Sequence, residues 1–182
     1  MKSVAMVLFK GVEPDFSKVR RDIEEAIRYF VPKLPIHEIA VAIPTGAYVA
    51  ERDQLDANRL ISELRSSEAV KDRKLTLAFT EMDMFYEKMN FVFGLAHAGW
   101  GKAVMSTFRL SRDPMLNPVS EGVFRERVFK ECMHEIGHLW ALGHCQDKKC
   151  VMSFSSTIIE VDGKLPRFCN SCELKLAPGL RR

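Results

Sequence analysis

The run His134-Glu135-Ile136-Gly137-His138 carries the strongest chemical signal in the sequence. On a helix, two histidines four positions apart differ by about 40° of rotation and about 6 Å of rise, so both imidazoles can reach one metal ion. Glu135 lies about 100° round the helix from His134, too far to complete the ligand pair but near enough to contact a water on the metal. This spacing is typical of zinc hydrolases, in which zinc acidifies a water and the carboxylate takes its proton. The alternative is a pair of buried histidines on an ordinary helix.

A third metal ligand is expected at His144, because a catalytic zinc has three protein ligands and an open position. In an unbroken helix, the six residues from His138 to His144 would turn the chain by about 600°. The helix must therefore end between them, and Gly143 can supply the positive φ that this exit needs. A surface histidine unrelated to the metal is the alternative for His144.

Four of the five cysteines form two close pairs, Cys145 with Cys150 and Cys169 with Cys172. Thiolates at such spacings are typical of a four-cysteine structural zinc site, and in a reducing compartment metal comes before disulfides. The surrounding segment has few apolar residues, so a metal would supply folding energy. The alternatives are buried thiols, disulfides in an oxidising setting, or a zinc knuckle that binds nucleic acid. Cys132 is interpreted as a small core residue.

The histidine pattern resembles that of the metzincin clan of zinc peptidases: His134-Glu135-x-x-His138-x-x-Ala141-x-x-His144. The residues that follow resemble one family of this clan, the archaemetzincins, through Cys145, Cys150-Val151-Met152 and Cys169-Asn170-Ser171-Cys172. The run Met89-Asn90-Phe91-Val92-Phe93-Gly94 also resembles this family. The resemblance implies a mixed sheet above a shallow cleft, with the substrate aligned along the edge strand, and it implies the four-cysteine zinc site as well.

The resemblance implies further roles downstream of the histidines. Met152 is expected in a turn beneath the catalytic zinc, although a lone methionine is more often a core filler. Phe154 and Ser155 are expected to line the primary specificity pocket. One position departs from the family, because Ala141 stands where a glycine is normal, and alanine in a left-handed turn costs about 1 kcal/mol. Either the alanine adopts a permitted turn geometry, or the exit from the helix shifts toward Gly143.

The surrounding pattern predicts an α/β fold with a mixed twisted sheet, packed helices, a long active-site helix and a zinc-clipped C-terminal segment. Apolar runs predict strands over residues 4–9, 36–43 and 75–79, and a hairpin of residues 90–96 and 102–110. Apolar spacing predicts helices over residues 15–30 and 53–66. A long helix is predicted over residues 123–142, where Val123, Arg127, Lys130 and His134 lie near one helical stripe. We expect one catalytic domain over residues 1–182, with a sheet and helix part at 1–119 and the metal sites at 120–182.

Composition excludes several other function classes. The formal net charge is +3, and no segment is basic enough to indicate nucleic acid or an anionic membrane as a partner. No apolar run approaches the roughly 20 residues of a transmembrane helix, and the run from Val4 to Phe9 is too short for a signal-peptide core. We therefore expect a cytoplasmic monomer.

Together these features predict a zinc-dependent metallopeptidase, of endopeptidase or aminopeptidase type, with two zinc ions per chain. Its substrate would be a peptide or protein, and Glu135 would be the general base. The alternative is a non-hydrolytic zinc protein that binds a partner through the same cleft, but such a module has no need of a base beside the metal. His97, with Trp100 in the predicted hairpin turn, is a weaker candidate for substrate binding, and His37 is interpreted as structural.

Overall fold

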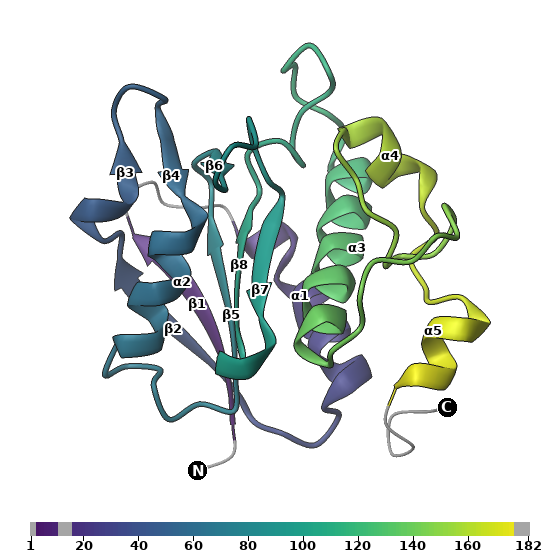
Figure 1. The fold of residues 1–182 in the computed structure, drawn as a ribbon, viewed down its shortest axis with the longest axis horizontal. Coiled ribbons are helices and arrows are strands. Elements are labelled where there is room, and N and C mark those ends of the chain that lie inside the picture. The colour runs from purple at the N-terminus through teal and green to yellow at the C-terminus, as the bar shows by residue number, and fades with distance from the viewer. Residues whose placement is uncertain (1–2, 11–15, 177–182) are drawn as a thin grey trace.

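A computed structural model describes residues 3–10 and 16–176 and is centred on a five-stranded sheet (Figure 1). The strand order is β2-β1-β5-β8-β7, with these bounds: β1 Val4–Lys10, β2 Ile36–Ala42, β5 Leu75–Thr80, β7 Gly94–His97 and β8 Lys102–Ser106. Strands β2, β1, β5 and β8 run parallel to one another. Strand β7 pairs antiparallel with β8 and forms one edge of the sheet. The predicted mixed sheet is confirmed. Asp15, where the first predicted helix begins, lies outside the described residues.

Helices cover both faces of this sheet, as Figure 1 shows. Met6 and Leu77 belong to the core beneath α1 (Arg20–Phe30) and α3 (Glu121–Leu139). Val7 and Ala78, the next residues along the same strands, belong to the core beneath α2 (Ala57–Ser66). Successive side chains of a strand point to opposite faces, so buried parallel strands need apolar residues at every position. The sheet is thereby fixed between two helical layers, with α3 beside the edge strand.

The second predicted helix is partly wrong at its start. Residues Gln54–Asp56 form strand β4, which pairs with β3 (Tyr48–Val49) and β6 (Met84–Phe85) in a small second sheet. The helix α2 begins only after Asp56, whose carboxylate accepts hydrogen bonds from the backbone N–H groups of Asn58 and Arg59. An aspartate at this position satisfies the free N–H groups of the first turn and fixes the helix start.

The predicted hairpin is confirmed as the β7–β8 pair, but its strands are shorter than expected. The connection is a single 3₁₀ turn, η3 (Ala98–Trp100), followed by Gly101 in the left-handed conformation. Strand β8 ends at Ser106, and the next residue, Thr107, donates its backbone N–H to the Thr80 carbonyl. Two further 3₁₀ turns are η1 (Phe16–Lys18) and η2 (Thr45–Ala47).

Two short helices that the sequence analysis missed lie in the C-terminal segment: α4 (Ile158–Gly163) and α5 (Asn170–Lys175). Each has six residues, too few to produce a recognisable apolar period. Thr157 and Glu160 form a reciprocal cap at the start of α4. Within residues 3–10 and 16–176, no helix is both long and apolar enough to span a membrane.

Candidate active site and second metal site

The long helix α3 and the turn after it bring the three predicted histidines together. His134 and His138 lie on the last turns of α3, and His144 follows its C-terminal exit. One ring nitrogen from each lies within 4.8 Å of the other two. Burial lowers the pKa of all three imidazoles, most strongly at His134, which favours the neutral form that a metal requires.

Backbone carbonyls fix which nitrogen of each helical histidine faces the site. Nδ1 of His134 donates to the Val151 carbonyl and Nδ1 of His138 to the Leu142 carbonyl, both at 2.8 Å. Each Nε2 therefore carries a lone pair, and the two Nε2 atoms lie 3.0 Å apart. Two lone pairs do not hydrogen-bond to each other, so this short approach needs another explanation. Two nitrogens bound to one tetrahedral zinc ion lie about 3.4 Å apart, close to the distance observed here. The donor set therefore fits zinc.

Ala141 itself makes the turn that delivers His144. Its φ is +62°, in the left-handed region, and α3 ends at Leu139. The Ala141 N–H bonds to the His138 carbonyl and the Leu142 N–H to the Gly137 carbonyl, at 2.9 and 3.1 Å. This is the Schellman ending of a helix with alanine in the position that glycine usually takes. The expectation that Gly143 supplies the positive φ is wrong, because Gly143 does not adopt one.

Glu135 is held deep between α3 and the edge strand. The residue is 4% exposed, and its Oε2 atom is buried without a hydrogen-bond partner among the described residues. Its carboxylate packs directly against Gly94, the first residue of β7. Burial raises the pKa of this carboxyl well above its usual range, and the neighbouring Glu131 adds to the rise. An unpartnered buried oxygen of this kind requires an explanation beyond packing.

A cleft of about 380 Å³ joins these groups to the edge strand. All three histidines and Glu135 line it on one side, and Gly94 to Ala96 of β7 line it on the other. Ser106 N–H bonds to the Phe93 carbonyl, so the alternating antiparallel pattern leaves the N–H and C=O groups of Gly94 and Ala96 pointing away from β8. Among residues 3–10 and 16–176, no second strand pairs with β7, so the strand edge that borders the cleft offers backbone groups to an extended chain.

Phe154 and Ser155, which the resemblance implies in the specificity pocket, line the same cleft. The Phe154 ring contacts that of His144, with centroids 5.1 Å apart. The Ser155 hydroxyl is buried and, within the described part of the chain, has no hydrogen-bond partner. Both residues are therefore placed to contact whatever occupies the cleft.

Sequence reasoning missed two charged residues of the cleft, Glu131 and Lys164. Their side chains are 3% and 1% exposed and form an ion pair of 3.3 Å. Glu131 lies one turn before Glu135 on α3, a helical spacing that could have shown the shared face. Lys164 comes from the end of α4, and nothing in the local sequence links it to the histidines. Its ammonium group contributes to lowering the pKa of all three imidazoles.

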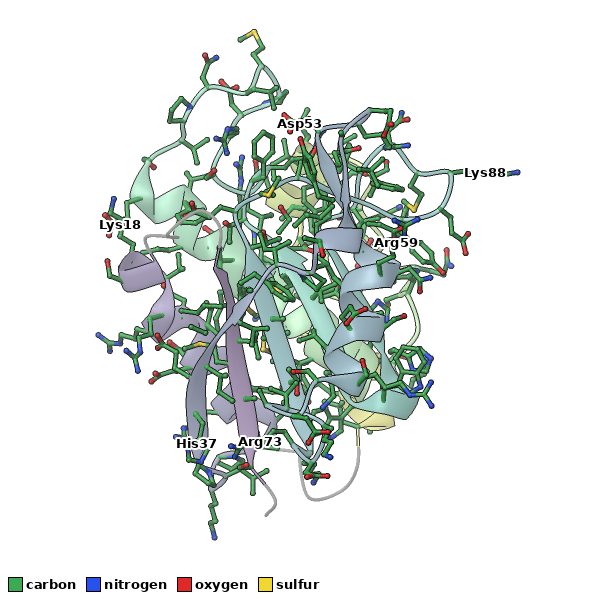
Figure 2. All side chains as sticks on the ribbon, turned by 90° about the vertical axis from the view of Figure 1, so that its left-hand side faces the viewer. Lys18, His37, Asp53, Arg59, Arg73 and Lys88 are labelled. Carbon is green, nitrogen blue, oxygen red and sulfur yellow. The ribbon has the colours of Figure 1, made fainter. Side chains whose placement is uncertain are left out.

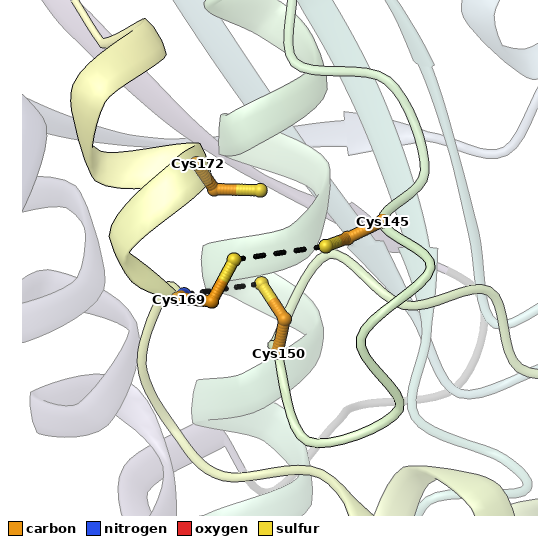
Figure 3. A group of neighbouring side chains, drawn as sticks. All are labelled: Cys145, Cys150, Cys169 and Cys172. Carbon is orange, nitrogen blue, oxygen red and sulfur yellow. Dashed lines mark hydrogen bonds between the residues drawn. The ribbon is translucent and has the colours of Figure 1, made fainter.

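The four predicted cysteines converge at a second site (Figure 3). Their sulfur atoms lie within 4.8 Å of one another, and those of Cys145 and Cys169 are 3.7 Å apart. Thiolates on a tetrahedral zinc are separated by about 3.8 Å, so the set fits that ion. The Cys169 N–H donates to the Cys150 sulfur, and hydrogen bonding, first from the Cys172 backbone, lowers the Cys169 pKa. Burial raises the pKa of Cys150 and Cys172 when no metal is present.

The segment 150–153 connects the two sites. The Met152 carbonyl accepts from the Cys145 N–H at 2.9 Å, and the neighbouring Val151 carbonyl binds the His134 ring. Met152 is fully buried, and its sulfur lies where a side chain at Gly137 would be, so glycine on α3 makes room for it. The cysteine pair, the methionine turn and the histidine helix therefore form one packed unit.

The remaining candidates belong to neither ligand group, although His97 lies between Ala96 and Ala98, which line the cleft. His97 is exposed and stacks on Trp100 with centroids 3.7 Å apart, and Arg65 covers the same indole. His37 lies on β2, at the opposite edge of the sheet from β7 (Figure 2). Cys132 is fully buried in the core and belongs to neither ligand group.

Convergent neutral imidazoles, a buried carboxylate beside them and an exposed strand edge in one cleft are the marks of a metal-dependent peptidase. The sequence profile of Peptidase family M54 matches residues 4–178. The chain is 38% identical to the archaemetzincin of Methanopyrus kandleri over 179 residues, covering 98% of each protein. It is 34% identical to that of Pyrococcus furiosus over 187 residues, covering 100% of this chain and 96% of the relative. The chain belongs to the archaemetzincins of peptidase family M54, a family of zinc metallopeptidases.

Solved structures agree with this assignment. The crystal structure of the M. kandleri archaemetzincin matches with a TM-score of 0.83 and 36% identity, covering 96% of this chain and 93% of that chain. The Archaeoglobus fulgidus archaemetzincin, crystallised in complex with malonate, matches with a TM-score of 0.78 and 30% identity, covering 97% and 100%. The resemblance seen in the sequence is confirmed at the level of family and fold.

Proposed function

We propose that this chain hydrolyses peptide bonds with Glu135 as the general base, beside a catalytic zinc held by His134, His138 and His144. The observation that carries the proposal is the buried, unpartnered Oε2 of Glu135, in the same cleft as three convergent imidazoles. A carboxylate buried only for packing would have a hydrogen-bond donor. One that takes a proton from water needs a free oxygen facing the reaction.

Each group then has a separate task. Zinc, when bound, is a Lewis acid that acidifies a water and polarises the scissile carbonyl. Glu135 accepts the proton of the attacking water at Oε2 and passes it to the leaving amine. When no metal is present, burial raises the pKa of this carboxyl, the direction in which a carboxylate becomes a stronger base. The backbone carbonyls of Val151 and Leu142 hold the rings of His134 and His138 in orientation.

The edge strand β7 is the proposed platform for the substrate. Gly94 and Ala96 present unpaired N–H and C=O groups, so a peptide in extended conformation can add to the sheet as a further strand. Such main-chain pairing holds any sequence, and side-chain pockets then select among substrates. Phe154 and Ser155 are proposed to line the pocket beyond the scissile bond, which would make this pocket part apolar and part polar.

A second, structural zinc is proposed at Cys145, Cys150, Cys169 and Cys172, giving two ions per chain. The sulfur separations support this assignment. Met152 is proposed to form the turn beneath the catalytic zinc, a role supported by its burial against Gly137. We further propose that residues 1–182 act as one catalytic domain and as a monomer.

Peptide turnover distinguishes this proposal from a non-hydrolytic binding module. The protein is incubated with a fluorogenic peptide library whose members carry either free or acetylated amino termini, and a peptide hydroxamate serves as a probe of an open metal position. Hydrolysis that a chelator abolishes and zinc restores is expected, and the two sets of termini separate endopeptidase from aminopeptidase activity. Absence of both turnover and hydroxamate binding by zinc-loaded protein would favour the binding module.

A further inference from the structure

We propose that Gly94 is a positioning residue for Glu135: its missing side chain forms the recess that holds the carboxylate of the general base. The inference deepens the proposed function and rests on the base role of Glu135. It concerns the interface between the edge strand β7 and the helix α3, which otherwise supply the substrate platform and the metal ligands separately.

The steric observation is direct. A Cβ atom at Gly94 would lie 2.4 Å from Oε1, 2.6 Å from Cδ and 2.7 Å from Cγ of Glu135. Non-bonded heavy atoms are at their optimal separation near about 3.5–4.0 Å, so all three distances are severe overlaps. Because Cγ overlaps as well as the carboxylate, turning the carboxylate about its own axis does not relieve the contact. The whole outer part of the glutamate side chain would have to move.

Backbone conformation does not explain the glycine. Gly94 does not adopt a left-handed φ, and it pairs with Met105 in regular antiparallel register. Any residue can adopt such a strand conformation, and glycine there is normally less favourable than a residue with a side chain. The close approach of Glu135 is therefore the local feature that requires glycine, as expected where another group contacts the backbone.

The position of the carboxylate matters because its freedom is already small. Glu135 is 4% exposed, its backbone is fixed within α3, and Glu131 occupies the adjacent turn. A side chain at Gly94 would push the carboxylate out of its recess and away from the geometry in which it meets the attacking water. A displacement of about 1 Å in a catalytic group can cost about 100-fold in rate.

The test compares Gly94→Ala with Gly99→Ala, a control in the turn after the same strand. At Gly99 the added Cβ would approach no atom closer than 3.4 Å, an ordinary contact. We expect kcat of Gly94→Ala on a peptide that the parent cleaves to fall about 100-fold, with KM within threefold and zinc content unchanged. Gly99→Ala should match the parent. A change in KM alone would show that Gly94 acts through substrate binding, and an unchanged kcat would also overturn the proposal.

A thermal-unfolding cycle gives a readout that does not depend on turnover. The shift in Tm caused by Gly94→Ala is measured in the parent and in a Glu135→Ala background, where the recess is empty. We expect a clearly more unfavourable shift in the parent, and equal shifts would overturn the recess. Glu135→Gln separates the two proposals: if that variant keeps near-parent turnover, the base role fails, whereas an inactive Glu135→Gln with a fully active Gly94→Ala refutes only the positioning role.

Discussion

Ala141→Gly should stabilise the protein, because Ala141 ends α3 in the left-handed conformation, with φ of +62°. An L-residue with a Cβ pays about 1–2 kcal/mol there. Glycine avoids this cost. It also makes the unfolded chain more flexible, which lowers the free energy of unfolding by about 0.4–1 kcal/mol and so offsets part of the gain. The side chain is exposed, so its removal loses little packing. The net expectation is a gain of about 0.5–1 kcal/mol, or about 1–4 °C in Tm for a chain of this length.

Gly143→Ala is the matched partner of this variant. A Cβ at Gly143 would meet nothing within 4 Å, and its φ is not left-handed, so the substitution should be neutral or slightly stabilising. Scanning calorimetry on zinc-loaded protein measures both variants. A lower Tm for Ala141→Gly combined with a lower Tm for Gly143→Ala would refute the reasoning, because it would place the left-handed residue at position 143.

Three further predictions follow from the two sites. Lys164→Met leaves the Glu131 carboxylate buried and unpaired, so the free energy of unfolding in urea should fall by about 3–5 kcal/mol. Adding Glu131→Gln should recover most of this loss. Equal stability of the single variant and the parent would contradict the prediction. Cys172→Ser should lose one zinc and also lower occupancy of the histidine site and turnover, because the 150–153 segment joins both sites, whereas Cys132→Ala should keep both ions. Full activity after loss of one zinc would show independent sites. In chelated protein, the pKa of His134 is lowered in the folded state, so the unfolded state binds more protons below about pH 6.5. Stability should therefore fall as the pH falls below that value, and it should fall less steeply in His134→Gln. Identical slopes of stability against pH in the two proteins would contradict this.

Much of the site could be predicted from the sequence because its spacing is helical. The separation of His134 and His138 places both on one face wherever the helix lies. The exit toward His144 was predictable in kind but not in place. Both Ala141 and Gly143 could make the turn, and the hydrogen bonds from residues 141 and 142 to the helix end decide for Ala141.

What could not be predicted depends on contacts between distant segments. Lys164 reaches the cleft because α4 packs against α3, a pairing that no local pattern encodes. Gly94 reads as an ordinary strand glycine until Glu135 is placed against it. Residues Gln54–Asp56 belong to the helix predicted over 53–66 from the apolar face of Leu60, Ile61 and Leu64, whereas pairing with β3 and β6 extends the backbone of this segment. In these three cases tertiary packing overrides local preference.

Whether Glu135 acts as the base is decided by kcat for Glu135→Gln, measured at a zinc content equal to that of the parent. Glutamine keeps the shape of the side chain but cannot take up the proton. Glu126→Gln is the control, because Glu126 is an exposed residue of the same helix whose carboxylate pairs with Lys130 and does not line the cleft. We expect kcat to fall about 10²–10⁴-fold for Glu135→Gln and to change by no more than about twofold for the control. Near-parent turnover by Glu135→Gln with the zinc site filled would contradict it.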